Sequence, residues 1–206
     1  MAGFHLFESM LWEPGHGVFL LERHLARLAA SATHFGFALD LPDLGARLER
    51  FARALPDVPR KLRLELEADG SSRFEHVDVK PSDPIRVRRA PAPVDSADEY
   101  LRHKTSRREV YEAALRACPG FADVLLWNER GELTETCAGN VVVERGGRRV
   151  TPPGACGLLP GTFRAELLAR GELEQEIVPI ESLGGADRLW FVNSVRRWCP
   201  IEYVAP

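Results

Sequence analysis

The sequence predicts a mixed α/β fold (α+β in character) made of two small domains. Hydrophobic residues repeat every three to four positions in some segments and every second position in others, so helices and strands alternate along the chain. Two prolines interrupt this pattern in residues 89–97, and proline is excluded from helix interiors and central strands. A chain of 206 residues is long enough for two such domains, each with its own core.

The first domain is expected over residues 1–90. A short hairpin at 4–12 and 17–21 precedes a helix at 21–35, where Gly36 can take the left-handed conformation that ends a helix. In residues 61–67 leucines alternate with charged residues, which is typical of a half-buried strand. The other elements expected here are a helix at 42–55 and strands at 74–79 and 85–88.

The second domain is expected over residues 104–206, after a linker at 91–103. Its first element is a helix at 106–117, with apolar residues on one face. A second helix is expected at 162–170, opened by a glycine-containing loop and closed by Gly171. The expected strands are 123–127, 140–144, 148–151, 175–180 and 188–193.

Composition and charge exclude several classes of protein. Hydrophobic residues make up 45% and charged residues 28%, and the net charge of -3 comes from interspersed signs. No basic stripe suggests nucleic-acid binding, and no apolar run approaches the roughly 20 residues that cross a bilayer. The N-terminus lacks signal-peptide features, so a cytoplasmic protein is expected. Its four cysteines are expected to stay reduced, and no residue spacing suggests a metal site.

Two places in the sequence are candidates for binding a phosphate group. Before the expected helix at 162–170, the backbone N–H groups of Gly161 and Thr162 lack helical partners and lie at the positive end of the helix dipole. Arg27, at the edge of the helix at 21–35, could fork onto a phosphate from the side. The alternatives are a plain strand-to-helix connection and a solvated helix face.

Lys104 and Glu135 are the candidate reactive groups. A nucleophilic lysine needs a lowered pKa, and Arg102, Arg107 and Arg108 bring positive charge near Lys104 in the sequence. The alternative is a basic surface turn. Uncharged small residues flank Glu135. This glutamate therefore either faces water or lies buried opposite a cationic group such as a protonated ring nitrogen.

Six motifs, in this order, resemble those of the class IV aminotransferase family, the fold-type IV pyridoxal-phosphate enzymes. They are Phe4-x-x-x-Glu8-Ser9, His24-Leu-Ala-Arg27-Leu, His103-Lys104, Thr134-Glu135-Thr-x-x-x-Asn140, Gly157-Leu-Leu-Pro-Gly-Thr-x-Arg164 and Phe191-Val-Asn-Ser194. The family includes branched-chain aminotransferases, D-amino-acid aminotransferases and 4-amino-4-deoxychorismate lyase. The resemblance implies two small mixed α/β domains with the cofactor site between them.

The resemblance also implies roles for individual residues. Lys104 resembles the lysine that carries pyridoxal 5'-phosphate as a Schiff base, and Glu135 resembles the carboxylate that pairs with the protonated pyridine nitrogen. Arg27, with the backbone of Gly161 and Thr162, resembles the phosphate clamp. The other implied site residues are Asn193 and Ser194, which close on phosphate or substrate, and Arg107, Arg196 and Arg197, which are candidates for binding the substrate carboxylates.

Within the family, residues 20–36 and 103–108 are most similar to 4-amino-4-deoxychorismate lyase domains fused behind aminodeoxychorismate synthase. The implied reaction forms 4-aminobenzoate and pyruvate for folate biosynthesis. One alternative is a branched-chain or D-amino-acid aminotransferase that uses the same Lys104 and Glu135 with 2-oxoglutarate. Another is a catalytically inactive relative that serves as a partner subunit. The resemblance further implies a homodimer acting on a small molecule, a functional link to the synthase, and no nucleic-acid or membrane partner.

Overall fold

The computed structural model describes residues 3–79 and 84–205. The chain divides into two compact units. The first unit comprises Met1–Pro81 and His103–Arg107, and the second comprises Ser82–Arg102 and Arg108–Pro206. The chain therefore passes from the first unit to the second, returns for five residues, and then completes the second unit.

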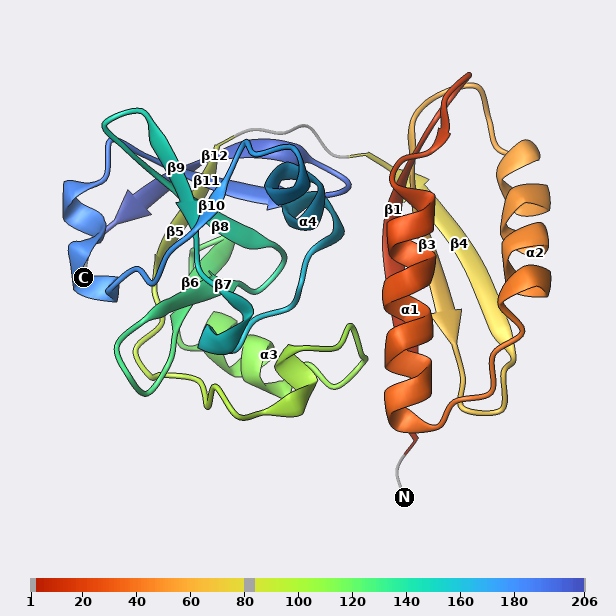
Figure 1. Cartoon of the computed structure of the whole chain (residues 1–206), viewed down its shortest axis with the longest axis horizontal. Helices are drawn as coiled ribbons and strands as arrows, with labels where there is room; N and C mark the ends of the chain where they lie inside the picture. Colours follow the sequence, from red (N-terminus) through yellow and green to blue (C-terminus); the bar gives the residue numbers. More distant parts are fainter. Residues whose placement is uncertain (1–2, 80–83, 206) are drawn as a thin grey trace. The chain divides into compact units, whose positions relative to one another are not determined.

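The first unit is a four-stranded antiparallel sheet in the order β2-β1-β3-β4, with two helices on one face (Figure 1). The leucines of β3 alternate with charged residues, as predicted, and pack against Leu28 and Leu48 from the two helices in one core. The elements are β1 (Leu6–Glu13), β2 (Gly17–Val18), α1 (Leu21–Phe35), α2 (Leu41–Arg53), β3 (Arg60–Leu66) and β4 (Ser72–Asp78).

Local signals in the sequence determine where the two helices begin and end. The predicted limits of α1 are confirmed, because Gly36 adopts the left-handed conformation with φ 71° just after the helix. In α2 the side chain of Asp40 accepts the Asp43 N–H at 3.0 Å, so this helix starts one residue before the predicted position. It ends at Arg53, two residues before the predicted end.

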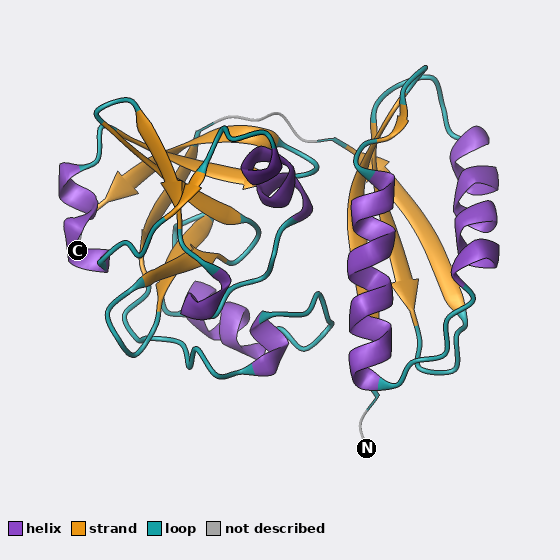
Figure 2. Cartoon of the chain, in the orientation of Figure 1, coloured by secondary structure: helices purple, strands orange, loops and turns teal. Residues whose placement is uncertain are grey.

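The second unit contains an eight-stranded mixed sheet in the order β10-β9-β8-β11-β12-β5-β6-β7. Figure 2 shows its strands in orange. An additional pairing of β7 with β8 closes six of these strands into a ring, and the closing pair is Glu135 opposite Asn140. Strands around the ring supply the core, for example through Val87, Val141 and Phe191. The strands are β5 (Ile85–Arg89), β6 (Asp123–Trp127), β7 (Leu133–Thr136), β8 (Asn140–Arg145), β9 (Arg148–Thr151), β10 (Glu174–Gln175), β11 (Arg188–Asn193) and β12 (Arg197–Val204).

The unit boundaries differ from the expected domains at 1–90 and 104–206. Strand β5, expected in the first domain, pairs with β6 and β12 because its apolar residues belong to the core of the second unit. Lys104, expected to open the second domain, belongs to the first unit. Most of the expected linker at 91–103 folds onto the second unit, where Val94 bridges to Asn128 and η1 (Glu99–Leu101) forms.

Other differences concern single elements of the second unit. Helix α3 (Glu109–Arg116) starts three residues after the predicted position, and α4 (Thr162–Ala169) starts where predicted. The expected strand at 175–180 was wrong beyond β10, which ends at Gln175, and its last residue, Ile180, opens η3 (Ile180–Gly185). Strands β7 and β12 were not predicted. None of the helices in the described ranges has the length and apolar character that spanning a bilayer requires.

Candidate active site

Lys104 lies in a segment that is bonded to the edge of β1 like a short additional strand. The Lys104 carbonyl accepts the Phe7 N–H at 3.0 Å, and the Ser106 N–H donates to the His5 carbonyl at 2.9 Å. The Ser106 Oγ also accepts the His5 N–H at 3.0 Å. These bonds, at Lys104 itself and at Ser106, hold the backbone of this segment, while the Lys104 side chain stays partly exposed.

His103, the residue before Lys104, is held by α1. Its imidazole stacks on that of His34, with ring centroids 4.4 Å apart, and meets the Phe35 ring edge-on at 4.9 Å. The Ser31 Oγ lies 2.9 Å from the His103 Nδ1, within hydrogen-bond distance. The helix therefore fixes the approach to Lys104 from one side, and β1 fixes its backbone from the other.

The Lys104 amine lies over an aromatic ring of β1. Its Nζ is 4.7 Å from the centroid of Phe7, and the guanidinium of Arg63 is 4.1 Å from the same centroid. Phe7 is a buried residue, so its ring offers a fixed apolar surface to the amine. Arg107, a candidate for binding substrate, lies 5.3 Å from the Phe4 ring centroid in the same unit.

Glu8, in β1, is a buried carboxylate with strong hydrogen bonds to α1. Arg27 donates to it through Nε at 2.8 Å and Nη2 at 2.5 Å, and the His24 Nδ1 lies at 2.7 Å. Burial raises the pKa of Glu8, but the charge of Arg27 and the bonds from both partners outweigh it and lower the pKa to about 2. Burial lowers the pKa of His24. At neutral pH a neutral imidazole therefore donates to an ionised Glu8.

The Glu8 contacts bear on the predicted role of Arg27. Two of the three guanidinium nitrogens bond to a carboxylate, so much of the Arg27 charge is already matched inside the first unit. Sequence reasoning placed Glu8 in a motif but gave it no role. A glutamate at a core-facing position of an otherwise apolar strand was the signal that could have found it.

Glu135, in β7, is a buried carboxylate with a different environment. It is 3% exposed and accepts hydrogen bonds from the Tyr111 hydroxyl at 2.9 Å, the Leu159 N–H at 3.2 Å and the Asn140 Nδ2 at 3.3 Å. These three donors are uncharged. Burial and the charge of Glu135 raise the pKa of Tyr111 well above its usual value. Tyr111 and Asn140 are therefore site residues that sequence reasoning did not assign.

The loop before α4 is packed tightly against Asn140. Gly161 is the N-cap residue of α4, and no side chain caps this helix end. A Cβ at Gly161 would overlap the Asn140 Oδ1, while the Asn140 Nδ2 donates to the Leu159 carbonyl at 2.9 Å. Only glycine fits here without displacing Asn140.

Asn193 ends β11, and Ser194 begins the turn that leads to β12. The Asn193 Oδ1 accepts the N–H groups of Val195 at 3.0 Å and Arg196 at 2.8 Å, and its Nδ2 donates to the Ala138 carbonyl at 3.2 Å. Asn193 thereby ties this turn to the turn that follows Glu135. Two further candidates flank the turn: the Arg196 guanidinium is 6.0 Å from the Phe191 ring centroid, and Arg197 has a positive φ of 56°.

The structure thus groups the predicted residues in two clusters. In the first unit, Lys104 and Arg27 lie near His24, whose pKa is lowered in part by the charges of both. In the second unit, Glu135 and Gly161 are joined through Asn140. The described residues contain no group of three or more histidine, cysteine or acidic side chains that could hold a metal ion.

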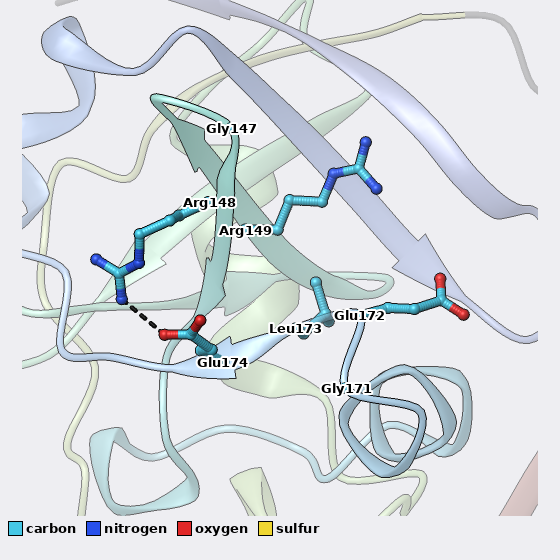
Figure 3. A pocket seen from close by; sticks show the side chains of 7 residues that line it. All are labelled: Gly147, Arg148, Arg149, Gly171, Glu172, Leu173 and Glu174. Carbon is cyan, nitrogen blue, oxygen red and sulfur yellow. Dashed lines mark hydrogen bonds and ion pairs between the residues drawn. The ribbon is translucent and has the colours of Figure 1, made fainter.

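A small hollow on the second unit contains none of the candidate residues. It has a volume of about 230 Å³ and is lined by charged side chains on β9 and beyond α4 (Figure 3). Arg148 pairs with Glu174 at 2.7 Å, and Arg149 pairs with Glu144 at 2.9 Å, so both arginines are matched. Ligand sites are usually larger and mostly apolar, so the hollow is not the candidate active site.

Comparisons with known proteins cover both units. A family model described as amino-transferase class IV matches residues 5–204. A Schizosaccharomyces pombe protein named "Putative aminodeoxychorismate lyase" is 27% identical, over 95% of this chain and 87% of that protein. The crystal structure of a "Putative amino-acid aminotransferase" from Mesorhizobium loti is 37% identical, with a TM-score of 0.90, over 98% of this chain and 100% of that one. The crystal structure of 4-amino-4-deoxychorismate lyase from Pseudomonas aeruginosa is 26% identical, with a TM-score of 0.79, over 97% of this chain and 82% of that one.

Proposed function

The chain belongs to the class IV aminotransferase family, a family of pyridoxal-phosphate enzymes, and we propose that it is a lyase converting 4-amino-4-deoxychorismate into 4-aminobenzoate and pyruvate. The main support for a pyridoxal-phosphate enzyme is Glu135, a buried carboxylate that accepts hydrogen bonds from the uncharged groups of Tyr111, Asn140 and Leu159. Such a group suits a protonated ring nitrogen, because burying that cation without an anion would be costly. The lyase names of the S. pombe and P. aeruginosa relatives support the choice of reaction.

The residues present fit pyridoxal phosphate at three points. Glu135 offers a buried carboxylate, Gly161 stands at the start of α4 where no side chain caps the helix, and Lys104 offers a primary amine on a fixed backbone. When bound, this cofactor supplies an aldehyde that takes up the substrate amine and a protonated ring that accepts electron density. The protein's part is to hold, orient and protonate the reacting groups.

Lys104 has two proposed tasks. It would hold the cofactor through its ε-amine, and as a free amine it would remove the proton from the amine-bearing carbon of the substrate. Loss of that proton is what elimination of the enolpyruvyl ether requires. The bonds to Phe7 and His5 keep the backbone at 104 fixed while the side chain moves between these tasks.

The remaining proposed roles concern binding. Backbone N–H groups of Gly161 and Thr162 would bind the phosphate at the positive end of α4, with Arg27 at its side. Asn193 and Ser194 would close over the phosphate or the substrate. The cations proposed for the two substrate carboxylates are Arg107, Arg196 and Arg197.

The direct test is product formation from 4-amino-4-deoxychorismate by the purified protein with pyridoxal phosphate and no oxo-acid. We expect equal amounts of 4-aminobenzoate and pyruvate. Lys104→Ala should abolish product, and Lys61→Ala is the matched control that should keep it. A protein that binds the cofactor but makes no product would rule out the lyase.

Attachment of the cofactor can be tested separately. The sequence contains three lysines, at positions 61, 80 and 104. After reduction with borohydride, peptide mass spectrometry should place the adduct on Lys104 and nowhere else. An adduct on either other lysine, or one that survives in Lys104→Ala, would overturn the assignment of Lys104.

An amino-acid aminotransferase is the second candidate, favoured by the 37% identity to the M. loti protein of that name. It would use the same Lys104 and Glu135. Incubation with branched-chain or D-amino acids should then convert the bound cofactor to its amine form, and 2-oxoglutarate should reverse the change. The lyase needs no oxo-acid, so dependence of turnover on 2-oxoglutarate separates the two candidates.

We also propose that the protein acts as a homodimer in folate biosynthesis, with a functional link to aminodeoxychorismate synthase. Light scattering during size-exclusion chromatography tests the dimer. Adding the synthase, with chorismate and an ammonia donor, tests the link, because 4-aminobenzoate should form only when both proteins are present. A monomer with full activity would contradict the first proposal.

A further inference from the structure

The first turn of α4 differs in charge from those of the other three α-helices. An acidic residue lies in the first turn of α1, α2 and α3, whereas the first turn of α4 has none and contains Arg164. The helix dipole favours a negative charge at this end and disfavours a positive one. A cation in the first turn therefore needs compensation from another source.

Arg164 is also buried, with an exposed fraction of 5%. Its Nε donates to the Thr151 Oγ1 at 3.2 Å, and its Nη2 donates to the Pro152 carbonyl at 2.8 Å and the Gln175 Oε1 at 3.0 Å. All three acceptors are uncharged. Among residues 3–79 and 84–205, no carboxylate hydrogen-bonds to Arg164. Burial lowers its pKa, but an arginine stays charged.

The acceptor at position 175 is uncharged although its neighbours are acidic. Glu174 and Glu176, on either side of Gln175, both pair with Arg148 at the surface (Figure 3 shows Arg148 with Glu174). The position that contacts Arg164 is an amide instead. The sequence thus provides carboxylates for the surface arginine and a neutral group for the buried one.

We propose that Arg164 is a positioning and specificity residue that makes the start of α4 select the phosphorylated form of the cofactor. Through Thr151, Pro152 and Gln175 it fixes the first turn of the helix, and its charge adds to the positive end of the dipole. A phosphate dianion would supply the anion that Arg164 lacks among its hydrogen-bond partners. This inference rests on the proposed binding of pyridoxal phosphate at Gly161 and Thr162.

Two other charged groups do not replace this role. Glu135 acts on Arg164 through space without a hydrogen bond to it. Arg27 is forked onto Glu8, so its charge is largely matched within the first unit. Of the two arginines, Arg164 is the one whose hydrogen bonds go to neutral groups.

The test compares two ligands that differ only in the phosphate. The protein freed of cofactor is titrated with pyridoxal 5'-phosphate and with pyridoxal, and the ratio of their dissociation constants reports the phosphate contribution. Arg164→Gln should lower the preference for the phosphate about 10-fold or more, and Arg164→Lys, which keeps the charge, should stay within about 3-fold of wild type. Arg148→Gln, a surface arginine, is the matched control and should not change the ratio.

A second variant leaves Arg164 in place. Gln175→Glu puts a carboxylate where the amide now contacts the guanidinium, so it should lower the same ratio while keeping or raising the melting temperature. If Arg164→Gln does not fold, Gln175→Glu tests the role of Arg164 in its place. A role limited to packing predicts equal losses for both ligands and an unchanged ratio, and that result would overturn the proposal.

The outcomes separate this inference from the proposed function. A ratio that falls in Arg164→Gln and Gln175→Glu, in a protein that forms no 4-aminobenzoate, supports the inference and refutes the lyase. If 4-aminobenzoate forms but both variants leave the ratio of dissociation constants unchanged, the lyase is supported and the role of Arg164 is refuted. A wild-type protein that binds neither ligand overturns both.

Discussion

The two units treat their buried charges in opposite ways. In the first unit, Glu8 is bonded to Arg27 and to His24, so the negative charge meets an opposite charge within the protein. In the second unit, Glu135 accepts hydrogen bonds from the uncharged Tyr111, Asn140 and Leu159 groups, and Arg164 donates to three uncharged acceptors. A charge that is already paired serves the fold, whereas a charge that hydrogen-bonds to neutral groups can still meet a charged ligand. We therefore expect Glu8 to act in folding and the two charges of the second unit to act in ligand binding.

Glu8→Gln should have the largest effect on stability. It removes the buried anion to which Arg27 and His24 hydrogen-bond, and breaking such a pair costs about 3–5 kcal/mol. Urea unfolding of the cofactor-free protein measures this loss. A loss below about 1 kcal/mol, typical of a surface pair, would mean that the first unit does not depend on this pairing.

The same carboxylate predicts how stability depends on pH. The pKa of Glu8 is lowered from 4.5 to about 2 in the folded protein. The stability it contributes is therefore complete above pH 4.5 and lost as the pH falls toward about 2. Urea midpoints measured across this range should fall less steeply in Glu8→Gln than in wild type. Parallel curves would contradict the prediction.

Glu135→Gln should have the next largest effect, on catalysis rather than on folding. The cofactor should stay bound, as its visible absorbance will report. Turnover should fall about 100-fold to 1,000-fold, the cost of losing one preorganised charge interaction with the transition state. Glu112→Gln, an exposed residue of α3 paired with Arg116, is the control. Unchanged turnover would remove Glu135 from the mechanism.

Gly161→Ala tests the phosphate end of the second unit. The added methyl would push into Asn140, which is itself bonded to Glu135 and to the Leu159 carbonyl. The strain is worth up to about 3 kcal/mol and should appear as weaker binding of pyridoxal phosphate in a titration. Gly154→Ala is the matched control, since a methyl there meets nothing within 4 Å. Equal affinities in the two variants would show that the start of α4 tolerates a side chain.

Tyr111→Phe should have the smallest effect of this series. It removes one of three hydrogen bonds to Glu135 and leaves two, so a loss of about 1.5 kcal/mol is expected in the free energy of unfolding. Denaturant titration of the cofactor-free protein measures it. A loss as large as that of Glu8→Gln would mean that the second unit also depends on the bonds to its buried carboxylate.

Some elements could be predicted from the sequence because their signals are local. The period of the apolar residues and a glycine just past the end are enough to define α1. Strand β7 has no such signal, because polar Thr134, Glu135 and Thr136 are buried there between the neighbouring strands β6 and β8. In β12, Pro200 breaks the pattern expected of a strand, although it pairs with Trp190. In both cases the tertiary environment overrides the local composition.

The candidate site, too, could be predicted only where the signal is local in the sequence. Lys104 and Glu135 were singled out by motifs, and their roles remain proposals. The partners of these residues could not be found in this way, because contacts such as Tyr111 with Glu135 or Phe7 with Lys104 join residues far apart in the sequence. For Arg164, the motif contained the residue, but only the structure shows that its hydrogen-bond acceptors are neutral.

The return of the chain to the first unit at His103–Arg107 has a consequence for how the protein is made and divided. During synthesis, the edge of β1 stays open until residues 104–106 have left the ribosome, so the first unit cannot be completed before the second has begun. A gene split between residues 81 and 82 would give an N-terminal fragment without Lys104. Such a fragment would have to capture the lysine from the other polypeptide by strand addition.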